Sequence, residues 1–196
     1  MYISKLVLNP QNRSVQRDLA DSYRLHQTIM KAFVGTSPGR VLFRLETGPE
    51  VNCILVQSEI RPQWAMIDDG YFVTEPTTKE VKLALRQGQR LRFRLRANPT
   101  VKRGGKREGL LSEDEQIAWL NRKGTVHGFT VMTVYVHDQR FEVGKSGSEG
   151  EVRMFCATFD GHLTVSDPEK LLQAVENGIG SGKGFGNGLL SLARAE

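Results

Sequence analysis

Apolar residues in the first half of the chain follow the periods of short strands and one helix. In residues 13–33 they recur at intervals of three and four, which predicts a helix. Residues 58–87 have a weaker pattern, in which Trp64 and the segment Tyr71-Phe72-Val73 are expected to pack on a preceding hairpin. The first half therefore predicts a strand over residues 2–8, a helix over 13–33, and a hairpin of strands over 40–46 and 51–57 that flank a Thr-Gly-Pro turn.

The second half has clearer boundaries. Ser112 and Glu115 form a capping box, which predicts a helix start. Asp167 followed by Pro168 predicts another, which ends at Gly178. The elements expected are a strand over 89–97, a helix over 112–123, strands over 126–136 and 151–159 with a flexible tip near 144–150, a helix from 168, and a strand over 188–194.

The order of elements predicts the fold class. The second half has the order βαββαβ, which is that of the ferredoxin-like split unit, and the first half begins in the same way. We therefore expect an α+β protein with two tandem ferredoxin-like (RNA-recognition-like) domains, residues 1–87 and 88–196. The sequence has no obvious internal repeat, so the duplication rests on the pattern of elements alone.

Composition excludes several classes of protein. The chain has 196 residues, of which 39% are hydrophobic and 25% charged, as in a folded domain. No apolar run approaches the ~18 residues of a membrane span. Cys53 and Cys156 are isolated, and the four histidines lack metal-ligand spacing. We expect a cytoplasmic protein with no cofactor, no metal and no membrane partner, whose net charge of +5 favours a polyanion.

The positive charge is concentrated in residues 82–107, which contain ten basic residues and no acidic one. Four arginines alternate with apolar residues in 90–97, so in a strand they share one face at a spacing suited to phosphates. The alternative is a solvated face with carboxylates on a neighbouring strand. The next segment, residues 100–109, is expected to be a loop with mobile cations. The candidates here for binding the phosphates of a nucleic acid are Arg90, Arg92, Arg94, Arg96, Lys102, Arg103, Lys106 and Arg107.

A second candidate site is the glycine-rich segment 178–188. It has six glycines at alternate positions, but it fails the phosphate-loop pattern twice, because Asn177 stands where glycine is needed and Gly184 follows Lys183. Such a backbone allows close approach and presents several N–H donors. The alternative is a plain flexible connector. The candidates for such contacts with a nucleic-acid backbone are Gly180, Gly182, Lys183 and Gly184.

The first predicted helix contains a third candidate. Tyr23 and His26 are three residues apart and share a face. Lys31 follows about 140° round the helix from His26 and reaches the same ligand only through its length. His26 also lies on the apolar stripe, so a buried histidine that serves only packing is the alternative.

These segments together resemble the CRISPR-associated endoribonucleases of type I-E systems, the CasE family. The segments that carry the resemblance are DSYRLHQTIMKAF, RLRFRLRANPTVKR and DPEKLLQAVENGIGSGKGFGNGLLSLA. The resemblance implies two ferredoxin-like domains and metal-independent cleavage of precursor CRISPR RNA at the base of the repeat hairpin. It also implies retention of the mature crRNA and assembly with other Cascade subunits. The family's tyrosine and histidine match Tyr23 and His26, and its basic residue matches Lys31.

Without a metal, the nucleophile must be the RNA's own 2′-OH, which leaves a cyclic phosphate or 3′-phosphate and a 5′-OH. Histidine suits either proton transfer, so whether His26 is the acid or the base stays open. Tyr23 would hold the 2′-OH or the phosphate, and Lys31 would stabilise charge. The alternatives are a non-catalytic RNA-binding subunit of the same fold and, more distantly, a metabolic enzyme that binds a nucleotide through the glycine-rich segment.

Overall fold

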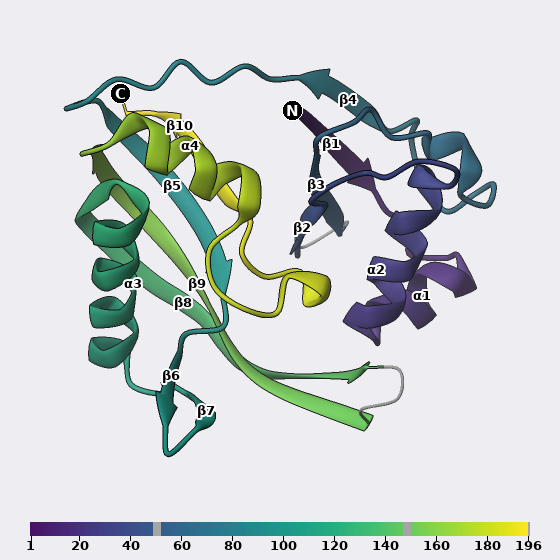
Figure 1. Ribbon diagram of the computed structural model, residues 1–196. Helices are drawn as coiled ribbons and strands as arrows, with labels where there is room; N and C mark the ends of the chain where they lie inside the picture. The colour runs from purple at the N-terminus through teal and green to yellow at the C-terminus, as the bar shows by residue number, and fades with distance from the viewer. Residues whose placement is uncertain (49–51, 147–149, 196) are drawn as a thin grey trace. The chain divides into compact units, whose positions relative to one another are not determined.

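The computed structural model describes residues 1–48, 52–146 and 150–195, and these form two compact units (Figure 1). The first unit comprises Met1–Lys82 with Val143–Val152 and Gly184–Gly186. The second comprises Leu83–Glu142, Arg153–Lys183 and Asn187–Glu196. The chain therefore returns twice to the first unit after the division at residue 82, whereas the sequence predicts a single junction near residue 87.

The first unit contains a four-stranded antiparallel sheet. Its strands are β1 (Tyr2–Val7), β2 (Leu42–Glu46), β3 (Cys53–Ser58) and β4 (Thr77–Glu80), in the order β2-β3-β1-β4. In the register, Leu6 pairs with Ile54 and Ser4 pairs with Thr78. The last strand thus lies beside the first, as in a ferredoxin-like sheet. The predicted hairpin of β2 and β3 is confirmed, although part of its turn lies outside the described residues.

The single helix predicted over residues 13–33 is wrong, because the segment forms three helical pieces: α1 (Arg13–Leu19), α2 (Ser22–Met30) and the 3-10 helix η1 (Lys31–Phe33). The break has a cap at its centre. Asp21 has extended backbone angles, and its carboxylate accepts a hydrogen bond from the amide of Tyr23, which starts α2. Buried Asp18 accepts hydrogen bonds from the hydroxyls of Thr28 and Tyr71, so it ties α1 to α2.

The core of the first unit lies between its sheet and its helical segments. Trp64, in the 3-10 helix η2 (Trp64–Met66), and Tyr71 belong to this core together with Phe43 of β2, which confirms that they pack on the hairpin. Val73, which was predicted to pack on the hairpin as well, is 55% exposed. The segment between β3 and β4 contains η2 where a ferredoxin-like unit has its second helix.

The second unit has the same strand order in its sheet. Strands β5, β8, β9 and β10 are arranged as β10-β5-β9-β8, and Leu95 of β5 pairs with Phe159 and with Leu190. Helices α3 and α4 contact each other and supply core residues such as Trp119 and Leu171. The bounds are β5 Arg90–Ala97, α3 Glu113–His127, β8 Phe129–Ser146, β9 Gly150–Val165, α4 Pro168–Asn177 and β10 Leu190–Arg194. The two predicted ferredoxin-like folds are therefore confirmed.

Caps account for where the helices of this unit begin and end. Ser112 accepts a hydrogen bond from the amide of Glu115, and Asp167 accepts one from the amide of Lys170, as predicted. Gly128, with φ +76°, ends α3. The prediction that a strand begins at residue 126 is therefore wrong, because α3 continues to His127. The tip predicted near 144–150 is strand over 144–146 and at 150, and the rest of it lies outside the described residues.

Residues 100–109 form an ordered hairpin rather than the mobile loop predicted. Strands β6 (Thr100–Arg103) and β7 (Lys106–Gly109) pair antiparallel, with Lys102 opposite Arg107. Gly104 and Gly105 both have positive φ, as the two central residues of a type I′ hairpin turn must. The cations of this segment are therefore held on a defined hairpin. No helix in the described part of the chain is long and apolar enough to cross a membrane.

Candidate active site and nucleic-acid interface

The candidate active site is centred on α2, which carries Tyr23 and His26. The two side chains are one turn apart, so they lie on the same face of the helix. Leu25 and Ile29 are buried in the core and fix the rotation of α2. The apolar stripe and the cap at Asp21 together determine the direction in which Tyr23 and His26 project.

His26 is half-buried and only partly satisfied. Its ring stacks on Phe43 of β2, with centroids 6.0 Å apart and planes 15° apart. Its Nδ1 is shielded from solvent, and no hydrogen-bond partner for that atom occurs among the described residues. Burial disfavours the charged imidazolium and lowers the pKa of His26 below its usual 6.5. At neutral pH His26 is therefore an uncharged group with an unused nitrogen, unlike a histidine that serves only packing.

Residues 184–186 of the glycine-rich segment lie against the same side chains. The Phe185 ring packs on Tyr23 at a centroid distance of 6.2 Å. A Cβ atom added at Gly184 would lie 3.9 Å from Cδ2 of His26, and one added at Gly186 would lie 3.1 Å from Cε2 of Phe43. Residues 184–186 belong to the first unit and form one wall around Tyr23 and His26.

Lys31 starts η1, directly after α2. Its Nζ is 3.9 Å from a carboxylate oxygen of Asp68, and both side chains are well exposed. Such a long exposed ion pair is weak and leaves the lysine free to move. The structure thus joins Tyr23 and His26 through residues 184–186, and it directs Lys31 towards Asp68.

The rest of the glycine-rich segment is tightly packed, which argues against a plain flexible connector. The amide of Ile179 donates to the carbonyl of Gly188, and the amide of Gly188 donates to the carbonyl of Arg96. A Cβ atom at Gly180 would lie 3.3 Å from the Trp119 ring, and one at Gly182 would lie 3.0 Å from Sδ of Met154. Glycine is therefore needed at these positions so that the backbone fits against neighbouring side chains.

A basic hollow of about 440 Å³ lies in the second unit, between the β6–β7 hairpin, α3 and the glycine-rich segment. Burial first, and then the charges of Lys123 and Lys183, lower the pKa of His127 on its wall. The ring of Trp119 lies 5.8 Å from Nζ of Lys123. Trp119, Lys123 and His127 have no distinguishing signal in the sequence, since only the fold brings α3 next to the hairpin. The side chains that define this basic hollow are those of Lys102, Arg107, Trp119, Lys123, His127, Ser181 and Lys183.

The four alternating arginines do not form one free row, and for two of them the alternative holds. Arg94 makes a bidentate ion pair with Asp160: its Nε is 2.7 Å from Oδ1 and its Nη2 is 2.8 Å from Oδ2. Arg96 is 5% exposed and pairs with carboxylates of Asp138 and Glu142 on β8. The carboxylates that pair with these two cations come from β9 and β8, so Arg94 and Arg96 are not free, and an RNA contact at either of them stays a prediction. Arg90 and Arg92 are exposed.

The cations of the β6–β7 hairpin also differ from one another. Arg103 has long contacts to Glu108 at 3.5 Å and to Glu115 at 3.4 Å. Lys106 is exposed at the turn, and Lys102 and Arg107 face the basic hollow. In the described residues no carboxylate forms an ion pair with Lys102, Lys106 or Arg107. These three remain open to a phosphate.

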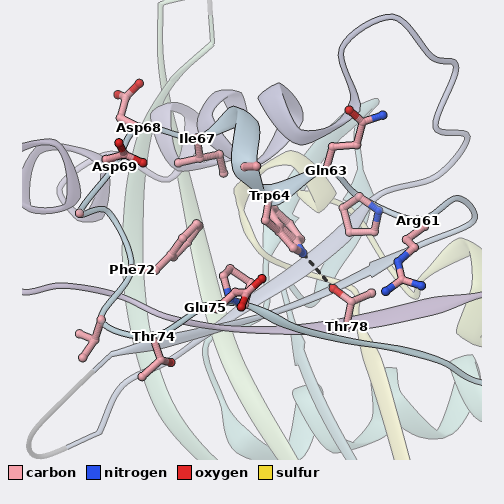
Figure 2. A pocket seen from close by; sticks show the side chains of 15 residues that line it. Arg61, Gln63, Trp64, Ile67, Asp68, Asp69, Phe72, Thr74, Glu75 and Thr78 are labelled. Atoms are coloured by element: carbon pink, nitrogen blue, oxygen red, sulfur yellow. Dashed lines mark hydrogen bonds between the residues drawn. The ribbon is translucent and has the colours of Figure 1, made fainter.

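A different hollow, of about 490 Å³, lies in the first unit (Figure 2). Trp64 and Phe72 form its apolar wall, and the indole Nε1 of Trp64 donates to the hydroxyl of Thr78. Carboxylates of Asp68, Asp69 and Glu75 stand around it, so it disfavours phosphate. For metal ions, the described ranges contain no group of three or more histidine, cysteine or acidic residues placed to hold one.

Comparison with known proteins identifies the family. The profile of a family described as CRISPR associated protein matches residues 1–194. The CRISPR-associated endoribonuclease Cse3 of Thermus thermophilus is 38% identical, and the match covers 98% of this chain and all of the relative. The chain belongs to the CasE family of CRISPR-associated endoribonucleases.

Two further comparisons extend this identification to other CasE proteins. The CRISPR system Cascade subunit CasE of Escherichia coli is 35% identical over 98% of this chain and 99% of that protein. The structure of Thermus thermophilus Cse3 bound to an RNA representing a pre-cleavage complex is similar at a TM-score of 0.87 and 38% identity, over 98% of each chain. The CasE fold seen in that RNA complex is therefore the fold of this chain.

Proposed function

We propose that this CasE protein is a metal-independent endoribonuclease that binds the hairpin of CRISPR repeat RNA and cleaves the precursor transcript at the base of the stem. The observation that carries the proposal is the pair of Tyr23 and His26 against residues 184–186, where burial keeps His26 uncharged. The Thermus thermophilus relative is named an endoribonuclease, and 38% identity over the full length supports the same activity here.

The reaction we propose uses the RNA's own 2′-OH. The 2′ oxygen forms a bond to the adjacent phosphorus, the bond from phosphorus to the 5′ oxygen breaks, the 2′ proton passes to a base, and the leaving 5′ oxygen takes up a proton to become a 5′-OH. His26 is suited to be that base, because its lowered pKa keeps it unprotonated at neutral pH. Tyr23, on the same face, offers an O–H donor to the phosphate or to the leaving 5′ oxygen. Lys31, weakly held by Asp68, can swing towards the charge that develops at phosphorus.

RNA binding is proposed to rest on the second unit. Lys102, Arg107, Lys123 and Lys183 surround the basic hollow, which can take phosphates of the hairpin stem. Lys106 extends this positive surface, whereas Arg90 and Arg92 are exposed cations of β5 that do not line the hollow. Backbone amides at Gly180, Gly182 and Gly184 would add donors where glycine lets the RNA backbone approach.

After cleavage, the protein is proposed to keep the mature crRNA and to assemble with the other Cascade subunits in the cytoplasm, where the precursor transcript is made. The name of the Escherichia coli relative, a Cascade subunit, supports this assembly. A tight product complex follows from the same contacts, because cleavage at the base of a stem leaves the bound hairpin intact.

The first test is His26→Ala with labelled repeat RNA in buffer containing EDTA. We expect the wild type to cleave, and the variant to be slower by roughly 10²–10⁴-fold, which is the usual contribution of one general acid or base. RNA affinity, measured by gel shift on the same preparation, should be nearly unchanged, because one neutral imidazole adds little beside many cations. A wild type that shifts the RNA without cutting it would instead show a non-catalytic RNA-binding subunit.

A substrate control tests the nucleophile. A single deoxynucleotide just upstream of the scissile phosphate should abolish cleavage and preserve binding, because the attacking oxygen is missing and the phosphates remain. The upstream product of the normal RNA should end in a cyclic phosphate or a 3′-phosphate and resist ligation until phosphatase treatment. If the deoxy substrate is cut at the normal site, the proposed mechanism is wrong.

A further inference from the structure

The sheet of the second unit has one face that its helices do not cover. On β5, Leu91, Phe93 and Leu95 are buried, and the Trp119 ring of α3 stacks on Phe159 of β9 on the same side. The alternating residues point to the other face. There Arg92 lies opposite His162 and Arg94 lies opposite Asp160. The open face is therefore polar and combines side chains from neighbouring strands.

A chain of contacts organises this open face. Arg94 donates hydrogen bonds to both carboxylate oxygens of Asp160, and Nε2 of His137 on β8 is 2.8 Å from one of these oxygens. Partial burial alone would raise the pKa of Asp160, but the hydrogen bonds from Arg94 and His137 outweigh it and hold the pKa below the usual value. The His137 ring is thereby fixed in position.

The chain ends at an exposed aromatic ring. Tyr135, two residues before His137 on β8, stacks on it with centroids 5.3 Å apart and planes 13° apart. Tyr135 is 68% exposed, the highest exposure among the large exposed hydrophobic residues described. A flat ring held in a fixed orientation and open to solvent is a platform on which an unpaired base can stack.

Next to this platform the open face is hollowed. A shallow depression of about 420 Å³ lies over β9, β5 and β10, where Gly161, Ser191 and Ala193 present small side chains or none. Arg92 and the Arg94–Asp160 pair stand on its sides. Arg92 is exposed, and within the described residues no carboxylate forms an ion pair with it. A free cation beside a stacking platform matches the phosphate and the base of one nucleotide.

We propose that this open face binds single-stranded RNA that continues from the repeat hairpin, with a base on the Tyr135–His137 stack and a phosphate at Arg92. The occupant is single-stranded because the faces of bases are accessible only where they are unpaired. The hairpin stem, whose phosphates are its main accessible groups, uses the basic hollow instead. The inference rests on the proposed function, to which it adds a second RNA site that binds single-stranded RNA instead of the hairpin stem.

The test compares two RNAs on one protein preparation: the repeat hairpin alone, and the same hairpin with a single-stranded extension of about ten nucleotides, within the site sizes of single-strand binders. We expect the wild type to bind the extended RNA more tightly. Tyr135→Ala should reduce affinity for the extended RNA about tenfold, the effect of one stacked base, and leave hairpin affinity and cleavage unchanged. Tyr135→Phe keeps the ring and should retain the preference.

Two further variants keep the test decisive. Met132→Ala, on the same strand and also exposed, should leave the preference intact. Arg92→Gln replaces an exposed side chain and should leave the packing of the sheet unchanged. It should reduce the slope of log K against log salt for the extended RNA by about 0.7, the value for one single-strand phosphate. The proposal is overturned if the wild type binds the extended RNA no more tightly than the hairpin alone. It is also overturned if Tyr135→Ala and Arg92→Gln both bind the extended RNA as the wild type does. Failure of the proposed function would be seen separately, as a wild type that does not cleave the hairpin.

Discussion

At the scale of single residues, burial decides the protonation of His26. The ring of Phe43 on one side and residues 184–186 on another exclude water, and among the described residues no carboxylate is hydrogen-bonded to the imidazole to favour its charged form. The pKa therefore lies below 6.5, and the neutral ring is ready to accept a proton. The sequence predicted His26 as a candidate, but it left the acid or base role open because burial cannot be read from spacing alone.

This environment makes a prediction for the pH dependence of cleavage. As pH falls through the lowered pKa of His26, we expect kcat/KM to fall, because the imidazolium cannot accept the 2′ proton; above pH ~6.5 the profile should be flat. The measurement is kcat/KM against pH. His127→Gln is the control, because the pKa of His127 is lowered too, and the fall in kcat/KM at low pH should persist when this second histidine is replaced. A rate that rises as pH falls would assign His26 as the acid.

At the scale of elements, the sequence predicted best where the boundary signal is local. Ser112, Asp167 and Gly178 are caps visible in the sequence, and the structure has helix ends at all three. The break between α1 and α2 was missed because the apolar periodicity continues through it. The capping hydrogen bond, from the amide of Tyr23 to Asp21, is visible only in the structure. The β6–β7 hairpin was missed because its strands are short and polar, and two glycines hold its turn.

The packing of residues 184–186 gives a prediction about one element. Gly186 has φ +81°, and a side chain there would press on Phe43. Gly186→Ala should destabilise the protein by about 1–2 kcal/mol through backbone strain. It should also slow cleavage by about tenfold to a hundredfold, because the wall beside Tyr23 and His26 moves. RNA affinity should change little.

The matched control for this variant is Gly35→Ala. Gly35 has a similar φ of +78° and nothing within 4 Å of its added Cβ, so the backbone strain is the same and no neighbouring side chain has to move. Thermal unfolding and single-turnover cleavage should be measured for both. An equal decrease in rate for the two variants would mean that strain alone, and not the position of residues 184–186, limits the reaction.

At the scale of the whole molecule, charge is divided between surfaces. Cations gather around the basic hollow of the second unit, whereas carboxylates surround the hollow of the first unit in Figure 2. The sequence predicted the cationic segment but not which cations are free. The partners of Arg94 and Arg96 are 42–66 residues away in the chain, so only the register of β5, β9 and β8 reveals them.

The division of charge predicts how salt acts on binding. Lys102→Ala combined with Arg107→Ala should weaken RNA binding and reduce the slope of log K against log salt by about 0.9 for each duplex phosphate that is no longer neutralised. The control is Lys5→Ala with Lys79→Ala, which removes two exposed lysines of the first unit. Titrations at several salt concentrations measure the slopes. An unchanged slope for the first pair would show that the basic hollow faces something other than RNA.

The return of residues 184–186 to the first unit has a consequence for protein synthesis. Tyr23 and His26 leave the ribosome early, but Phe185, which packs on Tyr23, follows only after most of the second unit has been translated. A nascent chain that ends before Gly184 thus contains Tyr23 and His26 without residues 184–186 beside them. Under the proposed function, cleavage activity is in this way coupled to translation of the second unit, and a truncated product is not expected to be a nuclease that lacks its RNA-binding surface.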